Sequence, residues 1–279
     1  MRQSISTSQG DYLLDTDKCD PYTNAELTIM LRLGFRQVNP AAGAAHGTFP
    51  DAERAGRKIV QWGSRMWDHW LQNFVRTAET YWNKRFWLTN NFPVLEFASS
   101  AAPYRPNIHC KLEITPSLSD NLTSHFVIDV VKLDPNERTF RSHSTLYDDK
   151  DTRPVITGYD QERKAIMQPA HVHEIGHLLG LGHVDIGKPH CPVSGNTNAR
   201  ACYGVADVDK NSVMGGGIRL RNEHAMPWGR AICPRISSAS TMCPPSNGIE
   251  AGRCGVVPTA RMMRSARAWR ISPLSVTIS

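Results

Sequence analysis

Residues 173–183 read His-Glu-Ile-Gly-His-Leu-Leu-Gly-Leu-Gly-His, and this stretch says more about the chemistry of the chain than any other. His173 and His177 are four residues apart, so on a helix their imidazoles lie on one face and can bind one metal ion. Gly180 allows the chain to leave the helix in a left-handed conformation and to turn back. His183 then reaches the same metal. The stretch predicts a zinc site with three histidine ligands.

The residue after the first histidine indicates a catalytic rather than a structural zinc. Three neutral imidazoles leave the fourth tetrahedral position open for water. Glu174 can take a proton from the zinc-bound water as it attacks a carbonyl, and can deliver that proton to a leaving amine. Zinc itself can stabilise the oxyanion, so the chemistry needs no separate nucleophile. The expected reaction is hydrolysis of an amide, most simply a peptide bond. The alternative is an amphipathic core helix whose histidines face a polar groove.

Two neighbouring groups compete with these assignments. Asp185 is an alternative third ligand in place of His183, although its offset does not match the motif. His171 lies two positions before His173 and therefore points to a different side of the helix. We expect His171 to be a second-shell or exposed residue rather than a ligand.

Composition limits the class of protein. The 279 residues are 40% hydrophobic and 21% charged, which is ordinary for a globular domain. No apolar run is as long as a membrane span, so we expect no transmembrane segment. Residues 1–10 are polar and lack the apolar core of a signal peptide. An extracellular location, or delivery by a route independent of a signal peptide, is favoured over the cytoplasm.

The net charge of +6 is unevenly distributed, because five arginines and no acidic residues follow Glu250. An anionic partner such as nucleic acid or lipid is one interpretation. A solvated tail or surface helix is the favoured one, since there is no nucleic-acid motif. We therefore expect no nucleic-acid partner.

Seven cysteines are present, and they cluster towards the C-terminus. Five lie in the last third of the chain, without a Cys-x-x-Cys pair, so a second zinc site is not expected. Their irregular, Pro- and Gly-rich surroundings favour disulfides and an oxidising destination. The pairing stays open. The cysteines are Cys19, Cys110, Cys191, Cys202, Cys233, Cys243 and Cys254.

Periodicity predicts an α+β order along the chain. Residues 1–50 read as an irregular segment, a pro-region or targeting region, with one short helix over 27–35 and a loop over 39–50. A long core-facing helix is expected from about Asp51. Its apolar stripe comprises Ile59, Trp62, Met66, Trp70, Phe74, Ala78 and Trp82.

Strands are expected after this helix. Val94–Phe97 is a short candidate, 108–114 alternates as a half-buried strand does, and His125–Leu133 has the composition of a central strand. Arg141–Leu146 is expected to be an edge strand. Pro169 suits the first turn of the helix that carries the histidines, whose buried side is formed by Val172, Ile175, Leu178 and Leu179.

The motif His-Glu-x-x-His-x-x-Gly-x-x-His, followed by Ser212-Val213-Met214-Gly215, resembles the metzincin clan of zinc metalloproteases. The resemblance covers roughly residues 60–230. It implies an apolar floor at Met214 beneath the zinc ligands. It also implies a mixed twisted sheet with a long N-terminal helix and an active-site helix above a cleft, and an irregular, cysteine-containing lower subdomain.

The resemblance also implies an arrangement of domains and substrate. A catalytic domain would span 51–232 and end in a helix over 219–232, which Pro227 complicates, and 233–279 would be a Cys- and Arg-containing C-terminal segment. Substrate would add as an extended strand along the sheet edge, with Arg141–Leu146 as the candidate. Cys19 could block the zinc in a latent form, although its surroundings do not match the propeptide motif of matrixins.

Two positions depart from the better-known branches of the clan. Val184 follows the third histidine, where individual families have Glu, Ser, Asp or Pro, so the family stays open. Gly216 stands where astacins and serralysins have a tyrosine ligand, so no such ligand is expected. The run 215–217 predicts an open, flexible turn.

These features lead to one principal hypothesis and two alternatives. The principal hypothesis is a monomeric endopeptidase with one zinc ion, which cleaves a protein or peptide substrate through a water activated by Glu174. The first alternative is a zinc hydrolase of a non-protein amide, because the motif fixes the metal and the water but not the acyl group. The second is a non-catalytic zinc-binding effector, against which the presence of Glu174 argues.

Overall fold

The computed structural model describes residues 2–17, 19, 23–51, 54–90, 95–98, 102–117, 123–140, 142–192, 196–239 and 271–273. The chain divides into two compact units. The first comprises 1–30, 82–113 and 221–279, and the second comprises 31–81 and 114–220. Both units combine strands with helices, so the expected α+β class is confirmed, and a mixed sheet is its main element.

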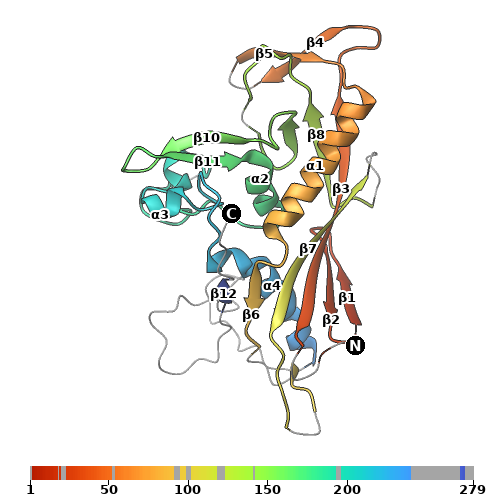
Figure 1. Ribbon diagram of the computed structural model, residues 1–279, viewed down its shortest axis with the longest axis vertical. Coiled ribbons are helices and arrows are strands. Elements are labelled where there is room, and N and C mark those ends of the chain that lie inside the picture. The colour runs from red at the N-terminus through yellow and green to blue at the C-terminus, as the bar shows by residue number, and fades with distance from the viewer. Residues whose placement is uncertain are drawn as a thin grey trace. The chain divides into compact units, whose positions relative to one another are not determined.

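The first unit is built on antiparallel strands. The strands follow the order β1-β2-β3-β7-β6-β12 (Figure 1). A 3₁₀ helix (Asn222–Ala225) and α4 (Met226–Ala239) complete the unit. Trp82, Phe86 and Trp228 are fully buried in it, and the Trp228 indole N–H donates to the Lys111 carbonyl at 2.7 Å. The strand bounds are β1 (Arg2–Ser6), β2 (Asp11–Asp15), β3 (Ala25–Val38), β6 (Phe86–Leu88), β7 (Ile108–Ser117) and β12 (Ile271–Pro273).

The expectation of an irregular N-terminal segment is wrong. Residues 1–50 contribute β1, β2 and the 14-residue strand β3, and the helix expected over 27–35 is part of β3. The physical reason is a period of two: Leu27, Ile29, Leu31, Leu33 and Phe35 are all buried, while the residues between them, apart from Gly34, are only partly buried. Alternation of this kind fits a strand and places one set of side chains in the core.

The second unit contains the parallel part of the sheet. β8 (Phe126–Val131) pairs in parallel with residues 33–38 of β3 and with β9 (Leu146–Asp148). Helix α1 (Ser64–Trp82) covers this sheet (Figure 1), and Phe35 of β3 contacts the rings of Trp70 and Phe74 edge-on at 6.1 and 5.2 Å. These aromatic contacts form the core of the unit.

The long helix begins later than expected. It starts at Ser64 rather than near Asp51, because a hairpin of β4 (His46–Asp51) and β5 (Arg54–Val60) precedes it. Ile59 therefore lies in β5, where it packs in a cluster with Val131, Leu133 and Phe140. Within the helix the predicted stripe is confirmed from Trp70 to Trp82, whereas Met66 is half exposed and Trp67 takes the buried position.

The strand predictions differ in their outcome. β7 alternates as expected, and β8 is the central strand predicted over 125–133. The edge strand expected over 141–146 is wrong, because the strand is Leu146–Asp148 and a turn precedes it, closed by a bridge between His143 and Leu146. In the predicted strand over 94–97, Phe97 forms an isolated bridge, while Val94 lies outside the described residues, as does Arg141.

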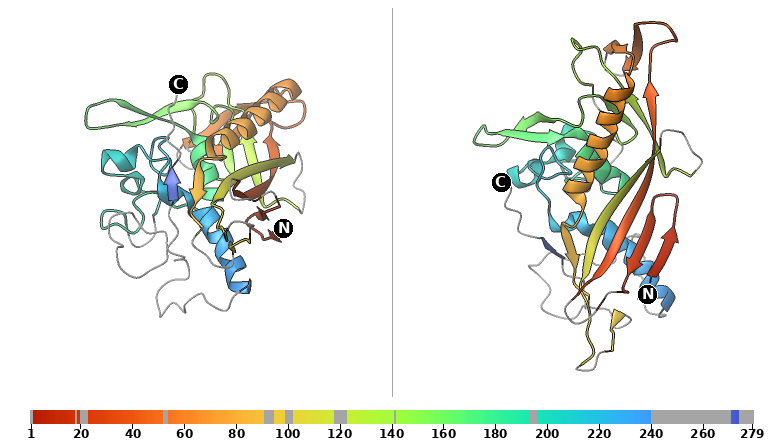
Figure 2. Two further views of the ribbon diagram at one scale, coloured as in Figure 1. Left: turned by 60° about the horizontal axis from the view of Figure 1, so that its bottom comes forward. Right: turned by 45° about the vertical axis from the view of Figure 1, so that its right-hand side comes forward.

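A second hairpin leads directly into the histidine motif. β10 (Pro154–Tyr159) pairs with β11 (Ala165–Pro169), and α2 (Ala170–Leu178) follows without a loop (Figure 2). Pro169 is the extended residue before α2 rather than part of its first turn. Beyond α2 the chain is mostly turns, with a 3₁₀ helix (Arg200–Tyr203) and α3 (Asp207–Lys210), as expected of an irregular cysteine-containing region.

The last helix agrees with the prediction apart from its bounds. Pro227 lies in the first turn of α4, where a helix does not use the missing N–H, so it does not interrupt the helix. Most of the C-terminal segment 233–279, with its arginines and with Cys243 and Cys254, lies outside the described residues. None of the helices among the described residues is long and apolar enough to cross a membrane.

Candidate metal centre

The three histidines of the motif converge on one point in the second unit. His173 and His177 project from α2, and His183 follows the turn at Gly180, whose φ of 83° is the left-handed conformation that glycine favours. The amide of Leu181 donates to the Gly176 carbonyl at 3.0 Å and that of Gly180 to the His177 carbonyl at 2.8 Å, which closes the helix end. The Nε2 atom of His177 lies 3.1 Å from the Nε2 atoms of both His173 and His183.

A backbone carbonyl orients each of the three rings. Nδ1 of His173 contacts the Val213 carbonyl at 2.7 Å, Nδ1 of His177 the Leu181 carbonyl at 2.8 Å, and Nδ1 of His183 the Thr197 carbonyl at 2.7 Å. A carbonyl can only accept, so each Nδ1 carries the proton and each Nε2 presents a lone pair. Burial lowers the pKa of His177, which favours the neutral ring that a metal requires.

Three lone pairs pointing at one another repel unless a cation lies between them. Two imidazole nitrogens bound to a tetrahedral zinc at ordinary bond lengths are about 3.3 Å apart, close to the separations found here. Among the described residues these three histidines form the one group of this kind that could hold a metal ion. The donor set therefore fits a metal with a preference for nitrogen, of which zinc is the commonest three-histidine case.

A tight turn at residues 212–215 adjoins the histidines through its backbone. The Gly215 amide donates to the Ser212 carbonyl at 2.9 Å, and Met214 is buried. The Met214 carbonyl accepts from the Val184 amide at 3.0 Å, next to His183 in sequence. This turn therefore contacts the His173 ring through the Val213 carbonyl and the residue after His183 through the Met214 carbonyl.

A buried glutamine from β11 supports the same turn. The side-chain amide of Gln168 donates to the carbonyls of Val213 at 2.9 Å and Gly217 at 2.5 Å. Gln168 is 5% exposed, so these bonds form away from water, where a missing donor would be costly. Gln168 therefore couples the hairpin to the carbonyl that orients His173. No sequence motif marked this residue.

The expectation of an open, flexible turn at residues 215–217 is wrong. A Cβ atom at Gly215 would lie 2.2 Å from the Asp209 carbonyl oxygen, and one at Gly217 would lie 2.3 Å from the Asn211 carbonyl oxygen. Neither position has room for a side chain. Glycine here permits close backbone packing rather than mobility.

A cavity of about 400 Å³ adjoins two of the three histidines, His177 and His183. Its lining also includes Glu174, Tyr203, Ser142 and His143. Glu174 is 8% exposed, so its carboxylate faces a confined space beside the ligands. The cavity can hold a substrate group next to both the metal position and a carboxylate.

A buried pair of acids lies behind the Ser142 wall. Burial and then the charge of Asp148 raise the pKa of Asp151 well above its usual range, with a smaller contribution from Glu174. Burial likewise raises the pKa of Asp148 to about 6. Ser142 donates to Asp151 at 2.5 Å, so one member of the pair holds the cavity wall. No periodicity or motif in the sequence marks this pair.

His171 and Asp185 both bond to groups other than the three histidines. His171 is buried rather than exposed and bonds to Thr77 at 2.7 Å and to the Asp151 carbonyl at 3.1 Å, away from the metal position. Asp185 is fully buried and binds Lys188 and His190, so it is not the third ligand. Cys19 belongs to the first unit, and its proposed role in latency stays a prediction.

Comparisons with known proteins place the chain in no family. No protein-family model, no curated protein and no solved structure matches it.

Proposed function

We propose that the protein is a zinc-dependent endopeptidase of metzincin type. The observation that supports this most is the convergence of three carbonyl-oriented histidines with Glu174 beside one confined cavity. A structural zinc site needs neither the carboxylate nor the open space. The turn at Ser212–Gly215, with its buried methionine, supports the clan.

In this proposal His173, His177 and His183 hold the metal, and Glu174 moves protons. When bound, zinc supplies an activated water at neutral pH and a Lewis acid that polarises the substrate carbonyl. Glu174 accepts the proton released as the water attacks and passes it to the departing amine nitrogen. The walls of the cavity restrict access of bulk water to this carboxylate, which strengthens its interactions with the reacting groups.

The proposed substrate is an extended peptide, and the sheet edge near Arg141–Leu146 does not offer it a free strand to pair with. The outer side of β9 is already occupied: Leu146 exchanges two backbone hydrogen bonds with His143, and the Asp148 amide and carbonyl both bond to Asp151. The chain enters β9 from Ser142 and His143, which line the cavity. We therefore expect the peptide to be bound by the cavity itself, where it would lie next to Glu174.

The experiment is the Glu174→Gln substitution, measured for bound zinc and for digestion of a broad peptide library. We expect zinc content to stay at the wild-type level and turnover to fall about 10³-fold or more, the size of a lost general base. Glu162→Gln on the exposed hairpin is the matched control and should change neither quantity. His177→Ala should lose the zinc. Library cleavage by Glu174→Gln at the wild-type rate would refute the mechanism.

The same library separates the endopeptidase from its alternatives. Cleavage that a chelator abolishes supports a peptidase. Zinc binding with no peptide cleavage, but with hydrolysis of small amides, would favour a non-protein substrate. Zinc binding with neither activity would favour a non-catalytic protein.

We also propose that the protein works in an oxidising compartment. The support is the disulfide between Cys191 and Cys202 beside the metal centre. Disulfides of this kind persist in extracellular and comparable environments and are rare in the cytosol.

A further inference from the structure

The third histidine is held differently from the other two. His173 and His177 are fixed by α2, whereas His183 lies in the turns beyond it. Two contacts orient its ring: Nδ1 lies 2.7 Å from the Thr197 carbonyl, and the Tyr203 ring lies 3.8 Å away, centroid to centroid. The position of this ligand therefore depends on the segment that contains Thr197 and Tyr203.

A disulfide ties that segment together. Cys191 and Cys202 are joined over a sequence separation of 11, with Thr197 between them and Tyr203 directly after the second cysteine. The Cys202 carbonyl also accepts from the amide of Asp185 at 3.0 Å, two residues beyond His183. The covalent bond thus restrains the two groups outside the histidine cluster that contact the His183 ring, Thr197 and Tyr203.

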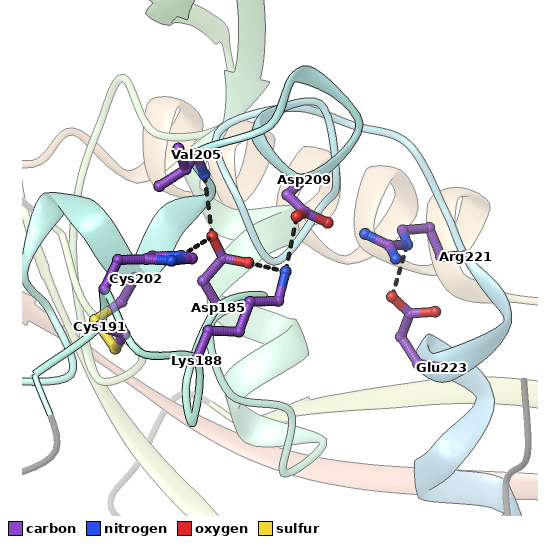
Figure 3. Close-up of polar contacts among 9 residues, drawn as sticks. Asp185, Lys188, Cys191, Cys202, Val205, Asp209, Arg221 and Glu223 are labelled. Carbon is purple, nitrogen blue, oxygen red and sulfur yellow. Dashed lines mark hydrogen bonds and ion pairs between the residues drawn. A yellow bond between two sulfur atoms is a disulfide. The ribbon is translucent and has the colours of Figure 1, made fainter.

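A charged network anchors the base of the same loop (Figure 3). Asp185 accepts from His190 at 2.6 Å and from the Val205 amide at 3.0 Å, on either side of the two cysteines. Lys188 joins Asp185 to Asp209, the latter at 2.8 Å. These bonds do not involve the sulfur atoms. Opening the disulfide should therefore free the loop around Thr197 while its base stays in place.

We propose that the Cys191–Cys202 disulfide positions the third metal ligand and makes metal affinity depend on redox state. This inference rests on the metal site of the proposed function. A thiol or phosphine reductant supplies two electrons, the S–S bond breaks, and each sulfur takes one proton to become a thiol. Thr197 and Tyr203 then lose their covalent restraint, His183 samples other orientations, and the metal is held mainly by the two histidines of α2.

The test measures zinc affinity by competition with a chromophoric chelator. Three samples are compared: the oxidised protein, the protein reduced with a water-soluble phosphine, and the Cys191→Ser/Cys202→Ser variant. The phosphine is oxidised to its phosphine oxide, whose oxygen comes from water. Loss of an outer-shell restraint typically weakens metal binding about 10- to 100-fold, so we expect a loss of that size on reduction and in the variant. Reductant added to the variant should cause no further loss, which excludes effects through other cysteines.

A second variant and a second readout distinguish the loss of one histidine ligand from the loss of the fold. Tyr203→Leu with the disulfide intact should also weaken zinc binding, because it removes the ring against His183. The visible spectrum of the cobalt-substituted protein should change on reduction, as expected when one imidazole leaves. Far-UV circular dichroism should stay unchanged. Loss of that signal on reduction would show that the disulfide holds the fold rather than one ligand, and would overturn the proposal.

The outcome is distinguishable from failure of the proposed function. Unchanged zinc affinity after complete alkylation of the opened cysteines refutes the positioning role, even if the protein is an endopeptidase. Redox-dependent zinc affinity combined with full activity of Glu174→Gln supports the positioning role and refutes the catalytic mechanism. Oxidised wild-type protein that binds no zinc refutes both.

Discussion

Replacing Gln168 by methionine should destabilise the second unit and weaken the metal site together. Methionine has nearly the same length but donates no hydrogen bond. The Val213 carbonyl would keep its bond from His173 Nδ1, whereas the buried Gly217 carbonyl would lose the bond from Gln168, 2.5 Å long. One buried acceptor without a donor costs about 2 kcal/mol in the free energy of unfolding. The Val213 carbonyl would lose its second bond, from Gln168, so it would fix the His173 ring less firmly, and we expect zinc affinity to fall about tenfold.

Urea unfolding monitored by tryptophan fluorescence gives the first quantity, and chelator competition gives the second. Gln61→Met is the matched control, since Gln61 is exposed, and it should change the free energy of unfolding by less than about 0.5 kcal/mol. A Gln168→Met protein as stable as this control, with wild-type zinc affinity, would refute the argument that the glutamine couples the hairpin to the ligands.

Two further substitutions test packing and titration. Gly217→Ala should cost about 2 kcal/mol or more in urea unfolding, since its Cβ would lie 2.3 Å from the Asn211 carbonyl oxygen, whereas Gly158→Ala, with open space around it, should be nearly neutral. Burial lowers the pKa of His224 to about 3, below its unfolded value near 6.5. The unfolded state therefore binds more protons between these values, and stability should fall by on the order of 4 kcal/mol as pH drops from 6.5 to 3. His224→Gln should flatten this slope in pH-dependent urea titrations, and the exposed His69→Gln should not; equal slopes in both variants would contradict the assignment.

The convergence of His173, His177 and His183 could be predicted from the sequence because a short, local rule governs it. His173 and His177 share a helix face, and Gly180 provides the left-handed turn that returns His183. All the information lies within eleven neighbouring residues, and no long-range contact is needed to read it. The buried faces of α1, β7 and β8 were equally readable, because their periods are long and regular.

The groups that orient the ligands could not be predicted in the same way. The carbonyls of Val213 and Thr197 lie outside the histidine motif in sequence. Every residue type has a backbone carbonyl, so the amino-acid sequence does not show which carbonyls accept these bonds. Gln168 looks like any polar residue of a strand until its partners are known. The helix predicted over 27–35 is wrong because Leu27 to Phe35 alternate with a period of two, which a strand and not a helix buries on one face. The flexible turn predicted over 215–217 is wrong because a glycine is used either where the backbone must be flexible or where another backbone segment packs too closely for a side chain. Only the neighbouring backbone distinguishes the two cases.

The main-chain origin of the three Nδ1 acceptors has a consequence for how this protein can evolve. Where carboxylates orient metal-binding histidines, a single codon change can abolish an acceptor. Here the acceptors are the carbonyls of Val213, Leu181 and Thr197, and no substitution at those positions removes the oxygen itself. Genetic drift can therefore alter these side chains while the three acceptors of the histidine rings persist. Insertions and deletions that shift the backbone register are the changes that selection must remove.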